Sequence, residues 1–267
     1  MKALLRMGET ELTVDLSRPI SLALDMEFSG REPRHFGAPA PITQPFAVPG
    51  FSGSVATGAS CNCSTITLTP HCNGTHTECV GHLTVEKSDA HRVLPAGLLP
   101  AVVLSVRAVS AGSTSETTTP APHAEDFLIT RAALETAWAS VGLFPANPQA
   151  VVIRTRYPAT AQEPSPYLTR AAVEWLVARG LEHLVIDLPS IDRAHDEGRL
   201  TAHRIFFGLP PRSRALGEAT RRHSTITELA CIPDRVPDGF CLLELQAPAI
   251  GGDAVPSRPL IYLPLTA

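Results

Sequence analysis

The sequence lacks a hydrophobic run long enough to span a membrane, for which about 20 consecutive apolar residues are needed. The opening stretch MKALLRMGETEL is interrupted by Arg6 and Glu9 before the apolar core of a secretory signal can form. An excess of one charge is also missing, because the formal net charge is -4 and the pI is near 6.2. We therefore expect a cytoplasmic protein with a small-molecule partner, and neither nucleic acid nor a membrane surface.

Cysteine pairs with the two-residue spacing of structural zinc sites are absent as well. Four of the six cysteines lie near a histidine cluster instead of being spread along the chain as disulfides would require. We interpret them as reduced thiols that pack as small hydrophobic residues. The six are Cys61, Cys63, Cys72, Cys79, Cys231 and Cys241.

Internal repeats and heptads are not found, and 267 residues with 44% hydrophobic content suffice for one domain over residues 1–267. Thr130 and Thr169 are each placed to cap a helix, and the strand patterns AVVIRTR and HLVIDLP follow the first and the second helix. Because strand, helix and strand alternate, a parallel crossover and an α/β fold are predicted.

Residues 28–60 are rich in Pro and Gly and show little periodicity. Irregular segments of this length within a compact domain usually serve function. Their apolar residues Phe36, Phe46 and Phe51 favour a packed segment. We expect this segment to form a pocket wall or an oligomer contact.

The run HCNGTHTECVGH, from His71 to His82, follows CSTITLTPH, whose alternation predicts a half-buried strand. In an extended chain His76 and Glu78 point to one face, and His82 can return to it. His71 lies five residues before His76, so a bulge at Asn73-Gly74 is needed to bring it to the same face.

Imidazole and carboxylate groups together suit zinc, manganese or iron, whereas calcium prefers oxygen ligands. We interpret the cluster as a metal site because its histidines and glutamate follow a strand-to-loop pattern. The remaining histidines are interpreted as surface or hydrogen-bonded structural residues. They are His35, His91, His123, His183, His195 and His223.

The cluster resembles the motif H-x-G-T-H-x-D-x-P-x-H of the cyclase-like metal-dependent hydrolases, which include bacterial kynurenine formamidase and isatin hydrolase. VVIRT, a helix containing EWL and VIDLPSID also occur in the family's order, so the resemblance extends from Leu12 over nearly the whole chain. It implies a swivelling-type β/β/α domain with a mixed sheet. It also implies a homodimer or homotetramer with one or two divalent ions, zinc or manganese.

The resemblance also implies roles for individual residues. His82 matches the catalytic histidine that transfers a proton. The implied metal ligands are His71, His76, Glu78, His203 and Glu228.

This chain departs from the motif in ways that concern the metal. One extra residue separates His71 from His76, Glu78 replaces the Asp, Val80 replaces the Pro, and the interval from His203 to Glu228 is longer. A longer carboxylate can reach the same ion from a displaced backbone. The N-terminal Trp of the formamidases is missing here, because both tryptophans lie in helical patterns, so N-formylkynurenine is not the expected substrate.

The predicted activity is the hydrolysis of an amide, a cyclic amide or imide, or a lactone. We expect an arylformamidase-like enzyme that acts on C–N bonds other than peptide bonds. The metal would lower the pKa of a bound water to about 7, and His82 would carry the proton to the leaving group. The alternative is a non-catalytic relative that keeps the fold and a metal. His82 favours the enzyme, because a structural site needs no proton shuttle.

The sequence allows more than one role for two further sets of residues. Asp187 and Asp192 could either orient a ligating histidine or cap a turn. Arg212, Arg214, Arg221 and Arg222 could bind an anion, although a solvated loop is the preferred interpretation.

Overall fold

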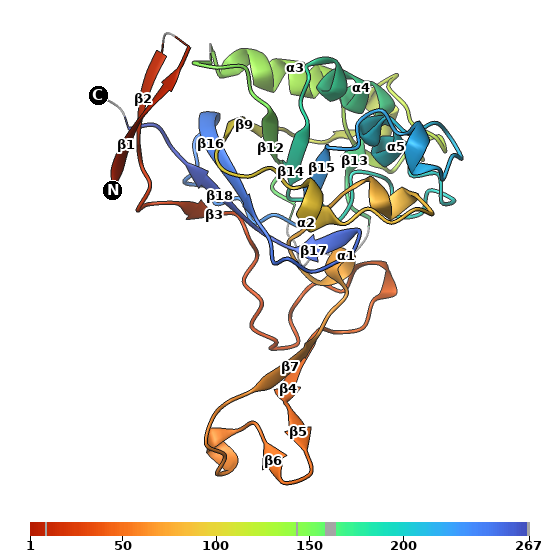
Figure 1. Ribbon diagram of the computed structural model, residues 1–267. Helices are drawn as coiled ribbons and strands as arrows, with labels where there is room; N and C mark the ends of the chain where they lie inside the picture. The colour runs from red at the N-terminus through yellow and green to blue at the C-terminus, as the bar shows by residue number, and fades with distance from the viewer. Residues whose placement is uncertain (9, 143, 158–163, 266–267) are drawn as a thin grey trace.

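The computed structural model describes residues 1–8, 10–142, 144–157 and 164–265. Within this part of the chain, nine strands form one curled mixed sheet (Figure 1). In spatial order they are β17 (Ala254–Pro256), β8 (His76–Glu78), β15 (Thr225–Glu228), β14 (His183–Ile186), β12 (Ala150–Arg154), β9 (Leu99–Ser105), β16 (Gly239–Gln246), β18 (Arg258–Tyr262) and β3 (Ile20–Ser21). Strands β9, β12, β14 and β15 run parallel, and the other pairings are antiparallel. The predicted α/β class and parallel crossover are confirmed.

Three helices, α3 (Arg131–Ser140), α4 (Arg170–Ala178) and α5 (Thr201–Phe207), pack on one face of this sheet. The predicted caps are present, because Oγ1 of Thr130 accepts from the amide of Ala133 and Oγ1 of Thr169 accepts from the amide of Ala172. Each cap satisfies an amide that the first helical turn leaves without a partner.

Both faces of the central strands are buried, which explains their nearly continuous apolar sequence. On β12, Val151 and Ile153 pack with the helices, while Val152 joins a second cluster on the opposite face. That second cluster includes Leu22 and Val236 from the loops. Because side chains alternate along a strand, one face of the sheet packs into the first apolar cluster and the other face packs into the second.

Outside the nine-stranded sheet, the three helices and residues 42–67, the strands and α-helices are short. They are β1 (Lys2–Met7), β2 (Thr10–Asp15), β10 (Val109–Ser110), β11 (Phe127–Ile129), β13 (Tyr167–Leu168), α1 (Pro70–Asn73) and α2 (Ala90–Val93). Residues 157–166, YPATAQEPSP, predict a Pro-rich loop, and this segment lies partly outside the described residues. Among the helices of the described ranges, none combines the length and the apolar character needed to cross a membrane.

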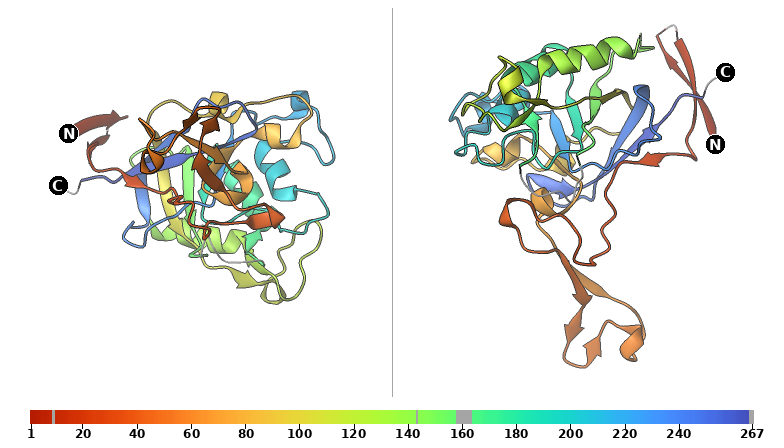
Figure 2. Two further views of the ribbon diagram at one scale, coloured as in Figure 1. Left: turned by 90° about the horizontal axis from the view of Figure 1, so that it is seen from below. Right: turned by 180° about the vertical axis from the view of Figure 1, so that it is seen from behind.

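Residues 42–67 form an arm that projects from the body of the molecule (Figures 1 and 2). It consists of two ribbons, β4 (Ile42–Pro45) with β7 (Ser64–Thr67), and β5 (Ala47–Val48) with β6 (Phe51–Ser52). The predicted strand before His71 therefore exists, but its half-buried character is wrong, since Ile66 is 58% exposed. Because β7 pairs with β4 alone, solvent reaches the side chains on β7.

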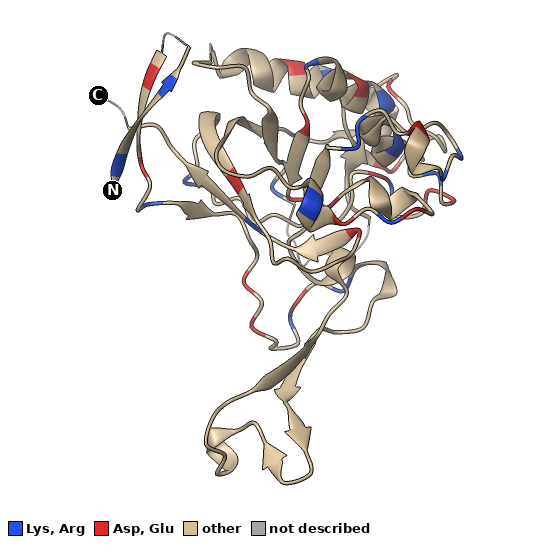
Figure 3. Cartoon of the chain, viewed as in Figure 1, with Lys and Arg blue, Asp and Glu red and all other residues tan. Residues whose placement is uncertain are grey.

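The arm also differs from the packed segment that its phenylalanines predicted. Phe46 and, at its base, Phe36 are exposed. Cys61 and Cys63 are exposed too, so the buried packing expected for the cysteines holds for Cys72, Cys79 and Cys241 and is wrong for the other three. All six thiols are free. Residues 35–77 contain no Lys, Arg, Asp or Glu, which leaves the arm without charged side chains (Figure 3).

Candidate metal centre

The centre of the site is a pair of neighbouring antiparallel strands. His76 and Glu78 lie two residues apart on β8 and therefore share a face. Glu228 ends β15 directly opposite His76, and Oε2 of Glu228 lies 3.5 Å from Nε2 of His76. All three side chains are buried. Strand pairing thus brings the carboxylate of Glu228 next to the motif at residues 76–78.

His71 reaches this group from a helical turn, and the bulge predicted at Asn73-Gly74 is wrong. His71 lies on α1, and its Nδ1 is 3.2 Å from Oε2 of Glu78. The Asn73 side chain holds this turn, because its amide donates to the carbonyls of Pro33 and Pro39. The extra residue between His71 and His76 is therefore accommodated by one turn of helix.

Gly74 leaves room for the flexible side chain of Met26. The backbone of Gly74 is extended, with φ −177°, a conformation open to any residue. A Cβ on Gly74 would, however, lie 2.4 Å from Sδ of Met26. Real contacts do not come this close, so a side chain here would have to displace Met26.

His203 enters from the helical layer and is oriented by Asp192. Its Nε2 is 2.9 Å from Oε1 of Glu78 and 3.5 Å from Oε1 of Glu228. Its Nδ1 donates to Oδ2 of Asp192, 2.7 Å away. Asp192 also accepts from the amides of Ala202 and His203 at the start of α5. A proton on Nδ1 leaves Nε2 free to act as a ligand.

Asp187, the other carboxylate left open by the sequence, has a different role. It accepts from the amide and hydroxyl of Thr155 and from the amide of Arg156. It therefore holds the segment that follows β12 instead of orienting a ligating histidine.

His82 lies on the 3-10 turn η3 (Val80–Leu83) at the open side of the site. Its Nε2 is 4.0 Å from Oε2 of Glu78, and its Nδ1 is 3.2 Å from Oδ2 of Asp253. The side chain of His82 is 28% exposed, whereas that of Glu78 is fully buried. Solvent therefore reaches His82, while the carboxylates of Glu78 and Glu228 remain buried.

Asp253 is the site residue that the sequence analysis missed. Its Oδ2 accepts from Nε2 of His71 at 2.9 Å and lies close to His82 as well. It comes from the loop before β17, 182 residues after His71. No spacing relates it to the histidine run, and the turn sequence Gly251-Gly252-Asp253 carries no signal beyond that of a loop.

The charges of the site keep its carboxylates ionised. Burial raises the pKa of Glu78, but the positive charges of His82 and His203 outweigh it and hold that pKa well below its usual range. Burial likewise lowers the pKa of His71, but the hydrogen bond to Asp253 and the interaction with Glu78 raise it to about 10. The carboxylates therefore attract positive charge into a buried place, which is the condition for binding a cation.

Unsatisfied polar atoms at the centre support the same conclusion. Nε2 of His76 and both carboxylate oxygens of Glu78 are buried and make no hydrogen bond of good geometry to a described residue, although imidazole nitrogens of His203 and His71 lie 2.9 and 3.2 Å from the Glu78 oxygens. Buried polar atoms are costly unless they have a partner or a metal. Three sets of ligand atoms lie within 4.8 Å of one another and could each hold an ion: His71 with His76 and Glu78, His71 with His82 and Asp253, and Glu78 with His82 and His203. The His and Glu cluster is thus suited to a divalent metal. Glu228 is in none of these three sets, and His82, predicted as the proton carrier, is in two of them.

The comparison with protein families agrees with this geometry. The family model described as Putative cyclase matches residues 14–193. That range includes the run from His71 to His82 and Asp192, and it ends before His203. No curated protein matches the sequence.

Solved structures similar to this chain extend over nearly its full length. A predicted metal-dependent hydrolase from Bacillus stearothermophilus has a TM-score of 0.58 and 15% identity, covering 92% of this chain and 98% of that chain. Isatin hydrolase A from Labrenzia aggregata, bound to benzyl benzoate, has a TM-score of 0.58 and 16% identity, with 92% and 93% covered. Isatin hydrolase A from Ralstonia solanacearum has a TM-score of 0.54 and 17% identity, with 92% of each chain covered. Likeness at these identities establishes a common fold.

Proposed function

The chain belongs to the cyclase family, and on this basis we propose that it is a metal-dependent hydrolase of an amide, a cyclic amide or imide, or a lactone. The observation that carries the proposal is the buried cluster of imidazole and carboxylate groups around Glu78, whose oxygens make no hydrogen bond of good geometry in the described part of the chain. The similarity in fold to structures of isatin hydrolases supports a carbonyl substrate of this class.

Five residues of the site would hold the metal. Glu78 is central, since imidazole nitrogens from His71, His82 and His203 all lie within 4.0 Å of its carboxylate. The donors combine nitrogen and oxygen, which suits zinc or manganese, in one or two ions. Such an ion supplies Lewis acidity, which polarises a carbonyl and makes hydroxide available at neutral pH. The proposed ligands are His71, His76, Glu78, His203 and Glu228.

His82 is the proposed proton carrier. It lies at the solvent side of the site, within 4.0 Å of the Glu78 carboxylate, where a substrate and the attacking water meet. In the proposed reaction His82 takes a proton from the water and delivers it to the leaving nitrogen or oxygen, so its own protonation is restored after each turnover.

Asp253 is the proposed positioning residue for this proton transfer. Its carboxylate holds Nδ1 of His82, so Nε2 faces the reacting atoms. A hydrogen bond at the second ring nitrogen fixes both the ring orientation and the tautomer.

The tryptophan positions argue against N-formylkynurenine as the substrate. Trp138 and Trp175 lie on α3 and α4 and pack edge to face, with ring centroids 5.6 Å apart. They therefore belong to the helical layer and do not supply an aromatic wall from the N-terminal segment. We propose a cyclic amide, formamide or lactone substrate with a different shape.

The arm is proposed to mediate a homodimer or homotetramer. Isolated two-stranded ribbons are only marginally stable, and open strand edges favour further contacts. Here the arm combines exposed apolar side chains, such as Ile42 and Val48, with the absence of charged residues from 35 to 77. Burial of this surface against another copy would stabilise both the arm and the assembly.

Metal analysis followed by an activity assay tests the proposed function. Elemental analysis should find about one or two divalent ions per chain after loading with zinc or manganese. The loaded protein should then hydrolyse at least one member of a panel of formamides, cyclic amides and lactones. Substoichiometric metal under every loading condition would contradict the proposal. Full loading without activity on the panel would favour the non-catalytic alternative.

A further inference from the structure

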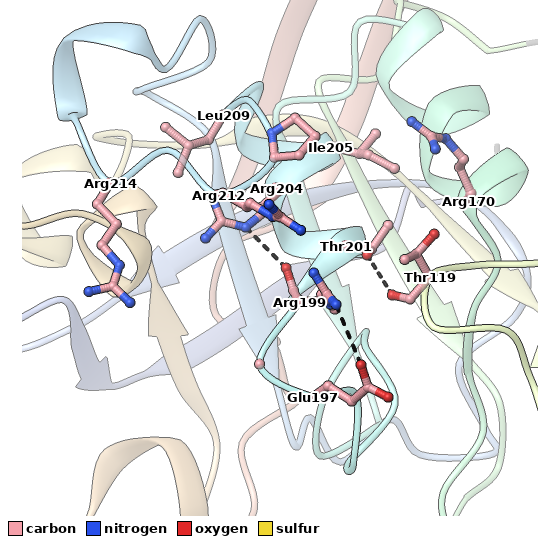
Figure 4. A pocket seen from close by; sticks show the side chains of 12 residues that line it. Thr119, Arg170, Glu197, Arg199, Thr201, Arg204, Ile205, Leu209, Arg212 and Arg214 are labelled. Atoms are coloured by element: carbon pink, nitrogen blue, oxygen red, sulfur yellow. Dashed lines mark hydrogen bonds and ion pairs between the residues drawn. The ribbon is translucent and has the colours of Figure 1, made fainter.

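A cavity of about 320 Å³ lies beside α5 and outside the candidate metal centre (Figure 4). Thr201, Arg204 and Ile205 line it from one side of the helix. Their spacing of three and four residues places them on one face, and His203 is not among the lining residues. The volume is within the range of about 300–1,000 Å³ that is typical of small-molecule pockets.

Arginines dominate the lining of this cavity. The five are Arg170, Arg199, Arg204, Arg212 and Arg214, and one acidic residue, Glu197, lines it with them. Arg170 pairs with Glu174, and Arg199 pairs with Glu197. Within the described ranges, Arg204, Arg212 and Arg214 have no carboxylate at ion-pair distance. These three arginines therefore form no ion pair, although the carboxylates of Asp192 and Asp196 lie near enough to interact with the charge of Arg204.

The guanidinium of Arg204 is held in place by backbone carbonyls. Its Nε donates to the carbonyl of Arg199 (Figure 4). Its Nη1 donates to the carbonyls of Pro210 and Ser213. A cation that is already immobilised would gain from an anion without further loss of side-chain freedom.

Arg199 also lines the cavity and has one donor with no partner among the described residues. Its Nε is buried and has no hydrogen bond to any described residue. Arginine nitrogens match the oxygens of phosphate and carboxylate groups, which accept two parallel hydrogen bonds. The donor set of the cavity is thus suited to an oxyanion.

The loop arginines singled out in the sequence divide into two pairs in the structure. Arg221 donates to the carbonyls of Phe206 and Leu181, and Arg222 donates to those of Ala219 and Gly217. These two arginines hold the fold together. Arg212 and Arg214 instead line the cavity.

We propose that this cavity is a binding site for a small organic phosphate monoester. Three arginines that form no ion pair fit the two negative charges of such a group better than the single charge of a monocarboxylate. The apolar wall formed by Ile205, Leu209 and Pro211 fits the organic part of the same molecule. The site is independent of the proposed hydrolase activity, since none of the proposed metal ligands lines it.

Isothermal titration calorimetry of the full chain with phenyl phosphate, inorganic phosphate, benzoate and phenol tests this proposal. Phenyl phosphate should bind most tightly, because it uses both the arginines and the apolar wall. Its affinity should fall as salt concentration increases. Absence of phenyl phosphate binding, or binding of benzoate with equal or greater affinity, would overturn the assignment.

Variants separate this cavity from the metal centre and from general surface charge. The double variant R212Q/R214Q should weaken phenyl phosphate binding at least tenfold. R107Q, at an exposed arginine elsewhere, should leave the affinity unchanged. Binding that survives R212Q/R214Q but is lost in H76A would place the phosphate at the metal centre and overturn the proposal. Equal losses in R107Q and R212Q/R214Q would do the same, because they would indicate a non-specific charge effect.

Discussion

The carboxylate of Asp192 accepts a hydrogen bond from Nδ1 of His203 at 2.7 Å and caps the helix that carries this histidine. One side chain therefore determines both where α5 begins and which nitrogen of His203 faces Glu78. This double contact links the position of the helical layer to the geometry of the metal centre.

Replacement of Asp192 should weaken metal binding without removing a ligand. In D192N the orienting carboxylate is lost, and the affinity for zinc should fall about 10- to 100-fold. Competition with a chelator of known affinity measures this change. D187N is the matched control, because Asp187 bonds to Thr155 and Arg156 and should affect stability alone. Equal metal affinity in D192N and the unaltered chain would contradict an orienting role.

Replacement of His82 should separate catalysis from metal binding. H82A should keep its metal and lose about 10²–10⁴-fold in turnover, because a proton carrier is removed and the proposed ligands remain. H76A should lose metal, since His76 lies buried at the centre of the site. Elemental analysis and steady-state kinetics of both variants provide the measurement. Loss of metal from H82A would instead identify His82 as a ligand.

Stability should decrease in acid partly because of His183. Burial lowers the pKa of His183 to about 4, and the positive charge of Arg221 adds to the effect. The unfolded chain has the ordinary pKa of about 6.5 and therefore binds the proton first as the pH falls. Protonation of His183 therefore does not reduce the free energy of unfolding above about pH 6.5. As the pH falls from there towards 4, this free energy decreases by up to about 3 kcal/mol.

Urea unfolding at pH 7 and pH 4.5 measures this contribution. H183Q should show a smaller loss of stability between the two values than the unaltered chain, because glutamine does not titrate. H223Q, at an exposed histidine, should follow the unaltered chain. Identical pH dependence in H183Q and the unaltered chain would show that His183 does not contribute.

Charge placed on the arm should disrupt the proposed oligomer. V48D/I66D introduces two carboxylates on a surface that otherwise has none, and their desolvation opposes burial against another copy. Light scattering coupled to size exclusion should show a dimer or tetramer for the unaltered chain and a 28.4 kDa monomer for the variant. V85D, at an exposed residue outside the arm, serves as the control and should remain oligomeric. A monomeric unaltered chain at micromolar concentration would contradict the proposal.

Local pattern was sufficient to predict the secondary structure around the crossover. Thr130 and Thr169 each cap a helix as predicted, because capping depends on residues only three positions apart. The shared face of His76 and Glu78 likewise follows from the two-residue period of a strand. The sequence by itself therefore determined the α/β class and the chemical types of the groups in the site.

Tertiary structure decided the features that depend on distant contacts. Asp253 joins His71 across 182 residues, and no local pattern encodes that approach. Asp192 and Asp187 occur in one short segment, yet only the packing of α5 brings Asp192 to a ligand-type histidine. His71 reaches Glu78 through a helical turn because Asn73 bonds to the chain near Pro33 and Pro39, which a strand-based interpretation could not foresee.

The exposure of the arm also depends on tertiary contacts. Alternating residues in β7 predict one buried face, but burial requires a second layer, and the described chain provides only β4 as a partner. Periodicity shows which side chains share a face, because it arises from backbone geometry within one segment. Which surface covers that face, and which distant carboxylate completes the site, depends on how the segments pack against one another.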